Sequence, residues 1–140
     1  MPPTNNQIQP MQDDPQPGKG KAKAIAVIGA AALALTAPII AKWEGKENDP
    51  YRDIVKVWTV CYGDTRNVVP GQRQTDAQCT DRLYAQIADH AMPIVKCVPG
   101  LLQPERKQQL AASVSLAYNI GTGGFCKSTV ARRFNAANWR

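Results

Sequence analysis

The stretch WEGKENDPYRDIVKVWTVCYG, residues 43–63, decides which fold the chain can adopt. Gly45 is a typical helix terminator, so Glu44 is expected in the last turn of a helix. Asp53 and Thr59 follow on a predicted turn and strand. Two carboxylates and a hydroxyl on separate rigid pieces of backbone can flank a bond that is broken by proton transfer and attack of water. The stretch is therefore a candidate active site.

The residues just before this stretch predict the helix that carries Glu44. Pro38 suits a first helical position. Ile39, Ile40 and Trp43 then share one face at i, i+1 and i+4. Apolar surroundings and a helix C-terminus both disfavour a negative charge, so both are expected to raise the pKa of Glu44. A carboxyl group that keeps its proton suits a general acid.

A small β-sheet is predicted after this helix. Asn48–Pro50 is a turn signal, and side chains then alternate from Val55 to Cys61 as in a strand. Gly63–Asp64 and Pro70–Gly71 mark further turns. Together these signals favour a β-hairpin or a three-stranded sheet.

The next segment predicts a long amphipathic helix. Thr75–Gln78 reads as a capping box, after which apolar side chains recur every four residues on one face, at Cys79, Leu83 and Ile87. Pro93 is expected to end or kink this helix. His90 lies near its predicted end without a companion ligand, and is expected to be an ordinary surface or capping residue.

Two further helices complete the pattern. One is expected from about Pro104 to Gly121, and a glycine-rich turn at 121–124 follows it. The hydroxyl of Ser128 can then cap a last helix that runs to about Asn135. One small sheet followed by helices predicts an α+β domain.

The N-terminal segment has two distinct parts. Residues 1–18 are rich in Pro, Gln, Asn and Asp and are expected to form a disordered tail. Lys19, Lys21 and Lys23 then precede an uncharged apolar run, residues 24–41. A basic flank before an apolar run is typical of an export signal or a membrane segment. Residues 19–41 are therefore predicted to be a signal anchor.

This predicted anchor is weak. Its few strongly apolar residues, at about −0.3 to −0.6 kcal/mol each, supply roughly −2 to −4 kcal/mol of insertion free energy. The run is also at the short end of the ~17 to 25 residues that span a bilayer. Two alternatives stay open: a cleavable signal cut at Ala32–Ala34, and an alanine-rich helix buried in a protein core.

Charge and cysteines leave several partners open. The net charge of +6 is compatible with a polyanionic partner, such as nucleic acid, anionic lipid or a cell-wall polymer, and equally with a basic surface that is simply solvated. The four cysteines are widely spaced and there is one histidine, which argues against a zinc site. An even number of cysteines behind an export-like segment favours disulfides, although four cysteines allow three connectivities. Reduced, buried cysteines are the alternative.

Several short motifs together resemble the phage-type lysozymes, the endolysins of glycoside hydrolase family 24, and in particular the lambdoid branch with a signal-anchor-release N-terminus. The motifs are Glu44-Gly45, Tyr51-Arg52-Asp53, Trp58-Thr59-Val60-Cys61-Tyr62-Gly63, Tyr118-Asn119-Ile120-Gly121, Phe125 and Ser128-Thr129. Glu44, Asp53 and Thr59 stand at the catalytic spacing of that family. The similarity extends over about residues 39–139.

The resemblance implies a phage-lysozyme-like α+β fold, with a small antiparallel β-sheet lobe followed by a mainly helical lobe, in a catalytic domain at residues 42–140. Glu44 would protonate the glycosidic oxygen of the β-1,4 bond between N-acetylmuramic acid and N-acetylglucosamine in peptidoglycan. Asp53 and Thr59 would hold and activate the attacking water, or Asp53 would stabilise positive charge that develops on the sugar.

The resemblance also implies substrate contacts for Tyr62, Asn119, Phe125 and Ser128, although helix capping explains Asn119 and Ser128 almost as well. No cofactor, metal ion or nucleic acid is expected, and the protein is expected to be a monomer. Its expected location is the host inner membrane, through residues 24–41 with the N-terminus cytoplasmic. Release into the periplasm for host-cell lysis would follow.

Two departures from the family pattern change these expectations. Asp64 stands where the family usually has a histidine, so a polar interaction expected there is changed or lost. Relatives continue beyond the position of Arg140, which predicts a truncated helical lobe with apolar surface exposed around Val114, Phe125 and Phe134. The alternative function is that of a catalytically inactive homologue that binds cell wall or membrane.

Overall fold

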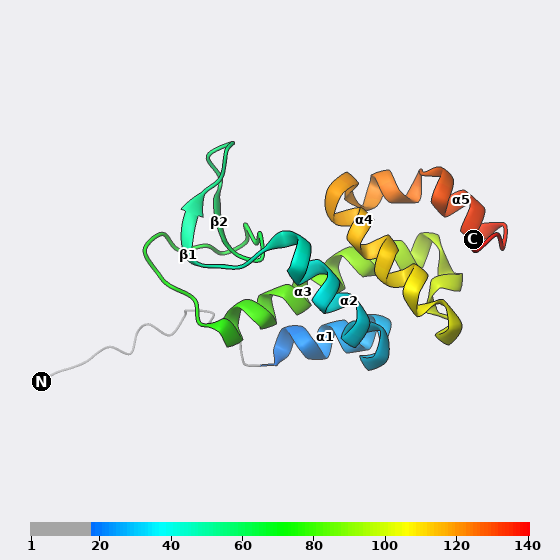
Figure 1. The fold of residues 1–140 in the computed structure, drawn as a ribbon, viewed down its shortest axis with the longest axis horizontal. Coiled ribbons are helices and arrows are strands. Elements are labelled where there is room, and N and C mark those ends of the chain that lie inside the picture. Colours follow the sequence, from blue (N-terminus) through cyan, green and yellow to red (C-terminus); the bar gives the residue numbers. More distant parts are fainter. Residues whose placement is uncertain (1–17) are drawn as a thin grey trace, which may run out of the picture.

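The computed structural model describes residues 18–140, which form a β-hairpin and a group of packed helices (Figure 1). In chain order the elements are α1 (Lys19–Ile28), α2 (Ala30–Glu44), β1 (Glu47–Arg52), β2 (Trp58–Cys61), α3 (Asp76–Cys97), η2 (Pro99–Leu102), η3 (Pro104–Arg106), α4 (Lys107–Cys126) and α5 (Thr129–Asn135). The α+β prediction is confirmed. Apart from Gly18, the predicted disordered tail lies outside the described residues.

The apolar N-terminal run forms two helices that pack into the protein. Helix α1 lies along α3, and α2 packs against α4 (Figure 1). Gly29 separates the two helices with φ 84° and ψ 158°, and the chain bends there by 115°. Among the described helices none is by itself long and apolar enough to cross a membrane. Only α1 and α2 taken together, as a bent pair, have the length and composition of a span. The folded chain thus shows the buried alanine-rich arrangement, and the signal anchor stays a prediction.

Helix α1 is fixed to α3 at its N-terminal end. The backbone N–H of Gly20 donates to Oδ1 of Asp81 over 2.9 Å, and Nζ of Lys23 donates to Oδ1 of Asp89 over 2.6 Å. A carboxylate is well placed at a helix N-terminus, where backbone N–H groups lack partners. A Cβ on Gly20 would lie 2.2 Å from the backbone oxygen of Asp81, so the close approach of the helices requires glycine.

Replacing Gly20 with valine is expected to displace α1 from α3, because the new side chain would overlap a backbone oxygen that cannot turn away. Overpacking of this kind typically costs about 1–3 kcal/mol. Amide hydrogen exchange in α1 should therefore rise relative to the wild type. Ala22→Val, on the exposed face of the same helix, is the control and should leave exchange unchanged. Equal protection of α1 in both variants would contradict the role of Gly20.

Helix α2 begins earlier than predicted. Pro38 lies inside the helix, so its expected place at the first helical position is wrong. The face that packs on α4, with Leu33 and Ile40 buried, compensates for the hydrogen bond that Pro38 cannot donate. The predicted apolar face is correct only in part, because Ile40 is 1% exposed whereas Trp43 is 74% exposed.

The end of α2 is where the sequence predicted it. Gly45 has φ 71° and donates its backbone N–H to the carbonyl of Ala41 over 3.0 Å. This C-terminal cap leaves Glu44 as the last residue of the helix. The chain then turns directly into the hairpin.

The sheet is a two-stranded antiparallel hairpin of β1 and β2. The predicted turn at Asn48–Pro50 is wrong, because these residues lie within β1. A break in the register between Glu47 and Tyr51 accommodates Pro50, which has no N–H to donate to a partner strand. The second strand starts at Trp58 rather than at the predicted residue 55, because residues 53–57 form the hairpin loop.

Helix α3 begins at the predicted capping box. The backbone N–H of Gln78 donates to Oγ1 of Thr75 over 3.1 Å, and Oε1 of Gln78 accepts from the backbone N–H of Thr75 over 2.8 Å. The predicted apolar face is buried, at Cys79, Leu83 and Ile87. Pro93 does not end the helix, which continues to Cys97. Burial on both sides of Pro93 outweighs its missing hydrogen bond, since Ala91 and Ile94 are 0% exposed.

Helix α4 is interrupted at Gly121, where φ is 81° and ψ is 157°. The break confirms the predicted stop, but the glycine-rich turn predicted at 121–124 is wrong, because a second helical segment continues to Cys126. Helix α5 is capped as predicted: Oγ of Ser128 accepts from the backbone N–H of Ala131 over 3.1 Å.

Two disulfides join the elements. Cys61–Cys79 links β2 to α3, and Cys97–Cys126 links the end of α3 to the end of α4. The prediction of disulfides is confirmed. The structure selects one of the three connectivities that the sequence allows.

The apolar surface predicted near the C-terminus is observed only in part. Val114 and Phe125 themselves are 0% exposed, whereas Ile120 and Val130, close to Phe125 in sequence, are 46% and 39% exposed. Phe134 is half-buried and stacks on Trp139 with 4.9 Å between ring centroids. Trp139 makes a second contact with the guanidinium of Arg106, which lies 4.7 Å from the centroid of the Trp139 ring. These aromatic contacts cover the core at this end of the protein.

Candidate active site

Glu44 lies where the hairpin joins the helices. Its Oε2 is 3.4 Å from the place that a Cβ on Gly63 would occupy. Gly63 follows β2 and has φ 75°, a conformation that glycine adopts without strain. The structure therefore brings the end of α2 and the segment after β2 into contact.

The surroundings of Glu44 favour its protonated form. Glu44 lies at the surface, and partial burial of its carboxyl raises the pKa above its ordinary value, while the nearby His90 lowers it in part. The predicted direction of the shift and the contribution of burial are confirmed, whereas the contribution of the helix C-terminus stays a prediction. Trp43 is too exposed to be the main source of this burial.

Asp53 closes the hairpin loop. Its Oδ1 accepts hydrogen bonds from the backbone N–H groups of Val55 and Val57, each over 2.9 Å. The backbone N–H of Asp53 also donates to the carbonyl of Val57 over 3.0 Å. Such bonds explain aspartate here on structural grounds, and they fix the direction of its carboxylate.

The side chain of Thr59 also binds Val57 of the hairpin loop. It is 4% exposed, and its Oγ1 donates to the backbone carbonyl of Val57 over 3.0 Å. The lone pairs of the hydroxyl oxygen are still able to accept a hydrogen bond from water. Because Asp53 and Thr59 both bind Val57, the hairpin loop holds them in a defined relation to each other.

The four residues expected to contact substrate lie in different surroundings. Asn119 is exposed and lines a groove of about 450 Å³ between α2 and α4. Tyr62 is half-buried against the core, and Ser128 caps α5. Phe125 is 0% exposed and packs in the hydrophobic core, so its expected contact with substrate is wrong.

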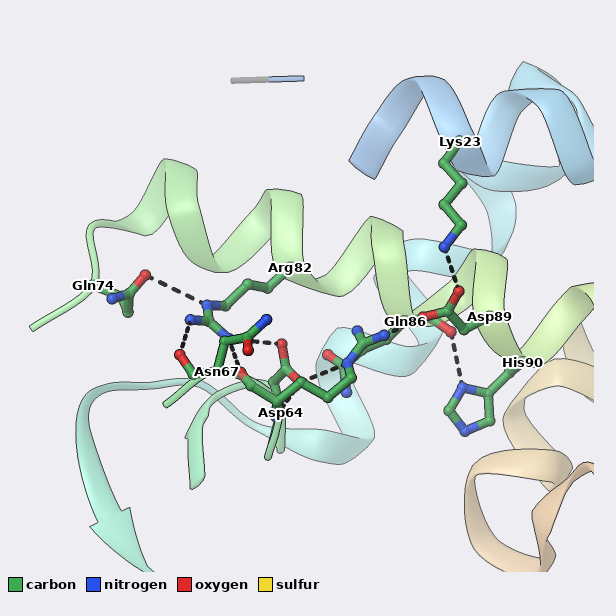
Figure 2. Close-up of polar contacts among 9 residues, drawn as sticks. Lys23, Asp64, Asn67, Gln74, Arg82, Gln86, Asp89 and His90 are labelled. Atoms are coloured by element: carbon green, nitrogen blue, oxygen red, sulfur yellow. Dashed lines mark hydrogen bonds and ion pairs between the residues drawn. The ribbon is translucent and has the colours of Figure 1, made fainter. Parts of the chain in front are cut away.

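A chain of charged side chains links α1, the segment after β2 and α3 (Figure 2). Asp64 is 2% exposed and accepts from Nε of Arg66 over 3.1 Å and from Nη1 of Arg82 over 3.0 Å. Arg66 also pairs with Asp89, which binds Lys23. Burial acts against the charge of Asp89, but the bonds from Lys23 and Arg66 prevail and lower its pKa. The polar interaction expected to change at residue 64 is therefore an ion pair with α3.

Sequence reasoning missed the place of His90. Its ring is half-buried and stacks on Tyr118, with 4.1 Å between centroids and 14° between planes. Its Nδ1 lies 2.8 Å from the carbonyl oxygen of Gln86. The expectation of an ordinary surface or capping residue is wrong. One signal could have found it, because His90 stands three residues after the buried Ile87, at the edge of the apolar face.

This fold and site define a class of protein. A carboxyl group with a raised pKa at a helix end, beside a hairpin that carries a second carboxylate, is typical of lysozyme-type glycoside hydrolases. Comparison with known families agrees, since residues 41–140 match the profile of the family described as phage lysozyme. The chain belongs to the phage lysozyme family.

The relatives of the chain carry endolysin names. It is 35% identical over 119 residues to the SAR-endolysin of Enterobacteria phage P21, a match that covers 77% of this chain and 68% of the relative. For the SAR-endolysin of Escherichia phage 933W the values are 34% over 115 residues, covering 79% of this chain and 63% of the relative.

Solved endolysins share the fold. The endolysin from Escherichia coli O157:H7 phage FAHEc1 matches with a TM-score of 0.65 and 29% identity, over 74% of this chain and 66% of that one. The active form of P1 phage endolysin Lyz matches with a TM-score of 0.63 and 25% identity, over 86% and 74%. The chain thus spans roughly two thirds to three quarters of these relatives. It is an endolysin-type glycoside hydrolase, the family implies peptidoglycan as substrate, and an inactive homologue is not favoured.

Proposed function

We propose that the chain hydrolyses the β-1,4 bond between N-acetylmuramic acid and N-acetylglucosamine in peptidoglycan, with Glu44 as the general acid. The observation that carries this proposal is the place of Glu44 at the end of α2 beside Gly63, where burial raises its pKa. A general acid must still hold its proton near the working pH. The net charge of +6 suits an anionic cell-wall polymer.

Asp53 and Thr59 are proposed to act on the water or on the sugar. Their common attachment to Val57 supports a joint role, because the loop holds both groups together. They would orient the attacking water, or Asp53 would stabilise positive charge on the sugar. Tyr62, Asn119 and Ser128 are proposed to form part of the wall along which the glycan lies.

The products of purified peptidoglycan test this proposal. After digestion and borohydride reduction, mass spectrometry should show new reducing ends at N-acetylmuramic acid. New reducing ends at N-acetylglucosamine, release of peptides alone, or no product would contradict it. Proton NMR of the first-formed anomer then distinguishes inversion from retention, which follow from different roles of the second carboxylate.

We further propose that residues 24–41 first hold the chain in the inner membrane, with the N-terminus cytoplasmic, and that the protein folds in the periplasm after release. The support is the basic flank before the apolar run and the SAR-endolysin names of the relatives. Leu33 and Ile40 cannot lie in a bilayer and in the protein core at the same time. The anchored form would therefore lack the packing that positions Glu44.

Strengthening the anchor without changing the core tests this step. Ala26, Ala31 and Ala34 are exposed in the folded protein. Leucine at all three positions should add about 1–2 kcal/mol of insertion free energy. We expect a larger membrane-associated fraction and delayed lysis, measured by fractionation and culture turbidity, while the purified released protein keeps its activity.

The control for this variant carries leucine at two exposed alanines outside the run, Ala77 and Ala136. It should behave as the wild type, because these positions do not enter the membrane. An unchanged membrane fraction and lysis time in the triple variant would exclude an anchoring role for the run.

A further inference from the structure

The loop that joins β1 to β2, residues 53–57, presents apolar side chains to solvent. The hairpin projects away from the helices, and this loop forms its far end (Figure 1). Ile54 is 99% exposed, more than any other large apolar side chain among residues 18–140, and Val55 and Val57 are 69% and 42% exposed. Single exposed apolar residues are ordinary, whereas adjacent ones mark a contact surface. Ile54, Val55 and Val57 together form an apolar tip.

The backbone of the loop makes its own hydrogen bonds. The N–H groups of Val55 and Val57 donate to Oδ1 of Asp53, each over 2.9 Å. The N–H of Lys56 donates to the carbonyl of Asp53 over 2.8 Å, and the N–H of Asp53 donates to the carbonyl of Val57 over 3.0 Å. Four of the five N–H groups at residues 53–57 therefore have partners inside the loop. Such a loop can leave water for an apolar medium without leaving these groups unpaired.

The same bonds argue against a sugar as the partner of the tip. Sugar hydroxyl groups need new hydrogen-bond partners when they lose water. The tip offers them aliphatic side chains, which neither donate nor accept, and N–H groups that are already engaged. An apolar medium is therefore the better complement of the tip.

Basic and aromatic side chains lie directly behind the tip. Arg52 and Lys56 are exposed, and neither pairs with a carboxylate among residues 18–140. The guanidinium of Arg52 lies 5.5 Å from the centroid of the Trp58 ring, which is half-buried. Aliphatic side chains in front of cations and an aromatic ring match the acyl and headgroup layers of a bilayer surface. The two cations suit anionic headgroups.

We propose that the apolar tip inserts into the surface of a bilayer that contains anionic phospholipid, with Arg52 and Lys56 on its headgroups. This contact belongs to the folded chain, in which Leu33 and Ile40 of the N-terminal run are 3% and 1% exposed. It is therefore separate from the proposed anchoring by residues 24–41, and it does not depend on hydrolysis. After the proposed release, the tip would keep the folded chain at the membrane surface.

Flotation of the folded full chain with vesicles of phosphatidylethanolamine and phosphatidylglycerol tests the proposal. Ile54→Thr combined with Val55→Thr keeps branched side chains but removes apolar surface, and should weaken the apparent affinity for lipid by about tenfold. Lys56→Gln should weaken it by about fivefold at low salt, and by less at high salt. Vesicles of phosphatidylcholine alone should bind the wild type more weakly.

The matched control is Leu102→Thr combined with Val130→Thr. It removes two exposed apolar side chains from η2 and α5, far along the chain from the hairpin. This variant should bind vesicles as the wild type does. Thermal unfolding of each variant confirms that the compared proteins are folded.

A second measurement locates the contact. Spin-labelled lipid should broaden the amide NMR signals of residues 54–57 more than those of α1 and α2, because the tip lies closest to the bilayer. Equal vesicle binding by the wild type and the tip variant would overturn the proposal, and so would broadening confined to α1 and α2.

Other partners of the tip would give different results. If the tip variant loses binding to peptidoglycan while its vesicle binding is unchanged, the partner is a glycan and the proposal is wrong. If the wild type ignores vesicles and forms a dimer that the tip variant does not form, the partner is a second copy and the proposal is equally wrong. Absence of hydrolysis by the wild type would overturn the proposed function and not this contact.

Discussion

Glu44→Gln is expected to slow peptidoglycan hydrolysis by about 10²–10⁴-fold. The amide has nearly the same shape as the carboxyl group, so the contact with Gly63 should be kept, but an amide is not an acid that can protonate the leaving oxygen. Dye release from labelled peptidoglycan measures the rate. Co-sedimentation with peptidoglycan should show unchanged binding, because the substitution removes a proton donor rather than a surface.

The matched control is Glu47→Gln, which makes the same chemical change three residues further on, at an exposed position of β1. It should hydrolyse at the wild-type rate. If Glu44→Gln retains that rate as well, Glu44 is not the general acid. A loss of both rate and binding would also argue against the assigned role, since it would point to a damaged fold.

Asp64→Ala is expected to lower the free energy of unfolding by about 3–5 kcal/mol. The Asp64 side chain is 3% exposed and the Arg82 side chain 13% exposed, so the substitution leaves a buried guanidinium without its counterion. It also removes the acceptor of the Arg66 side chain and backbone N–H. Urea unfolding with both disulfides intact measures the effect.

An exposed ion pair provides the comparison. Asp49 and Arg73 pair over 2.6 Å, with side chains 63% and 65% exposed. Asp49→Ala should cost less than about 1 kcal/mol, because water already screens both charges. Equal unfolding midpoints for the two variants would mean that burial of Asp64 does not contribute to stability in the way the structure indicates.

The position of Asp64 links stability to the active site. It follows Gly63 directly, and Gly63 is the residue whose backbone lies against Glu44. The same carboxylate is joined through Arg66 and Asp89 to Lys23 of α1. Docking of the N-terminal helix and the placement of the loop beside the acid thus share one network.

Local signals determined much of the fold. The cap of α2 at Gly45, the capping box at Thr75 and the Ser128 cap of α5 depend on residues within one helical turn, and all three are observed. The buried face of α3 follows from its periodicity. The motifs from Glu44-Gly45 to Ser128-Thr129 indicated the family only when taken together, because a single pair of acidic residues at that spacing is common by chance.

Other features depended on partners far away in the chain. Pro38 and Pro93 remain inside helices because their neighbours are buried, and local propensity does not include that contribution. The cysteine pairs were one choice among three. His90 acquired its place from Tyr118, which lies on another helix.

The N-terminal run shows most clearly which features the sequence determines and which depend on the tertiary structure. Its composition is the same for a membrane segment and for a core helix, since both remove apolar side chains from water. The sequence by itself determined that residues 24–41 must be buried somewhere. Only the tertiary structure decided where: Gly29 allows the bend, and α3 and α4 offer faces that cover both halves. The stretch from residue 43 to 63 could be interpreted alone, whereas the helix that supports it required the rest of the protein.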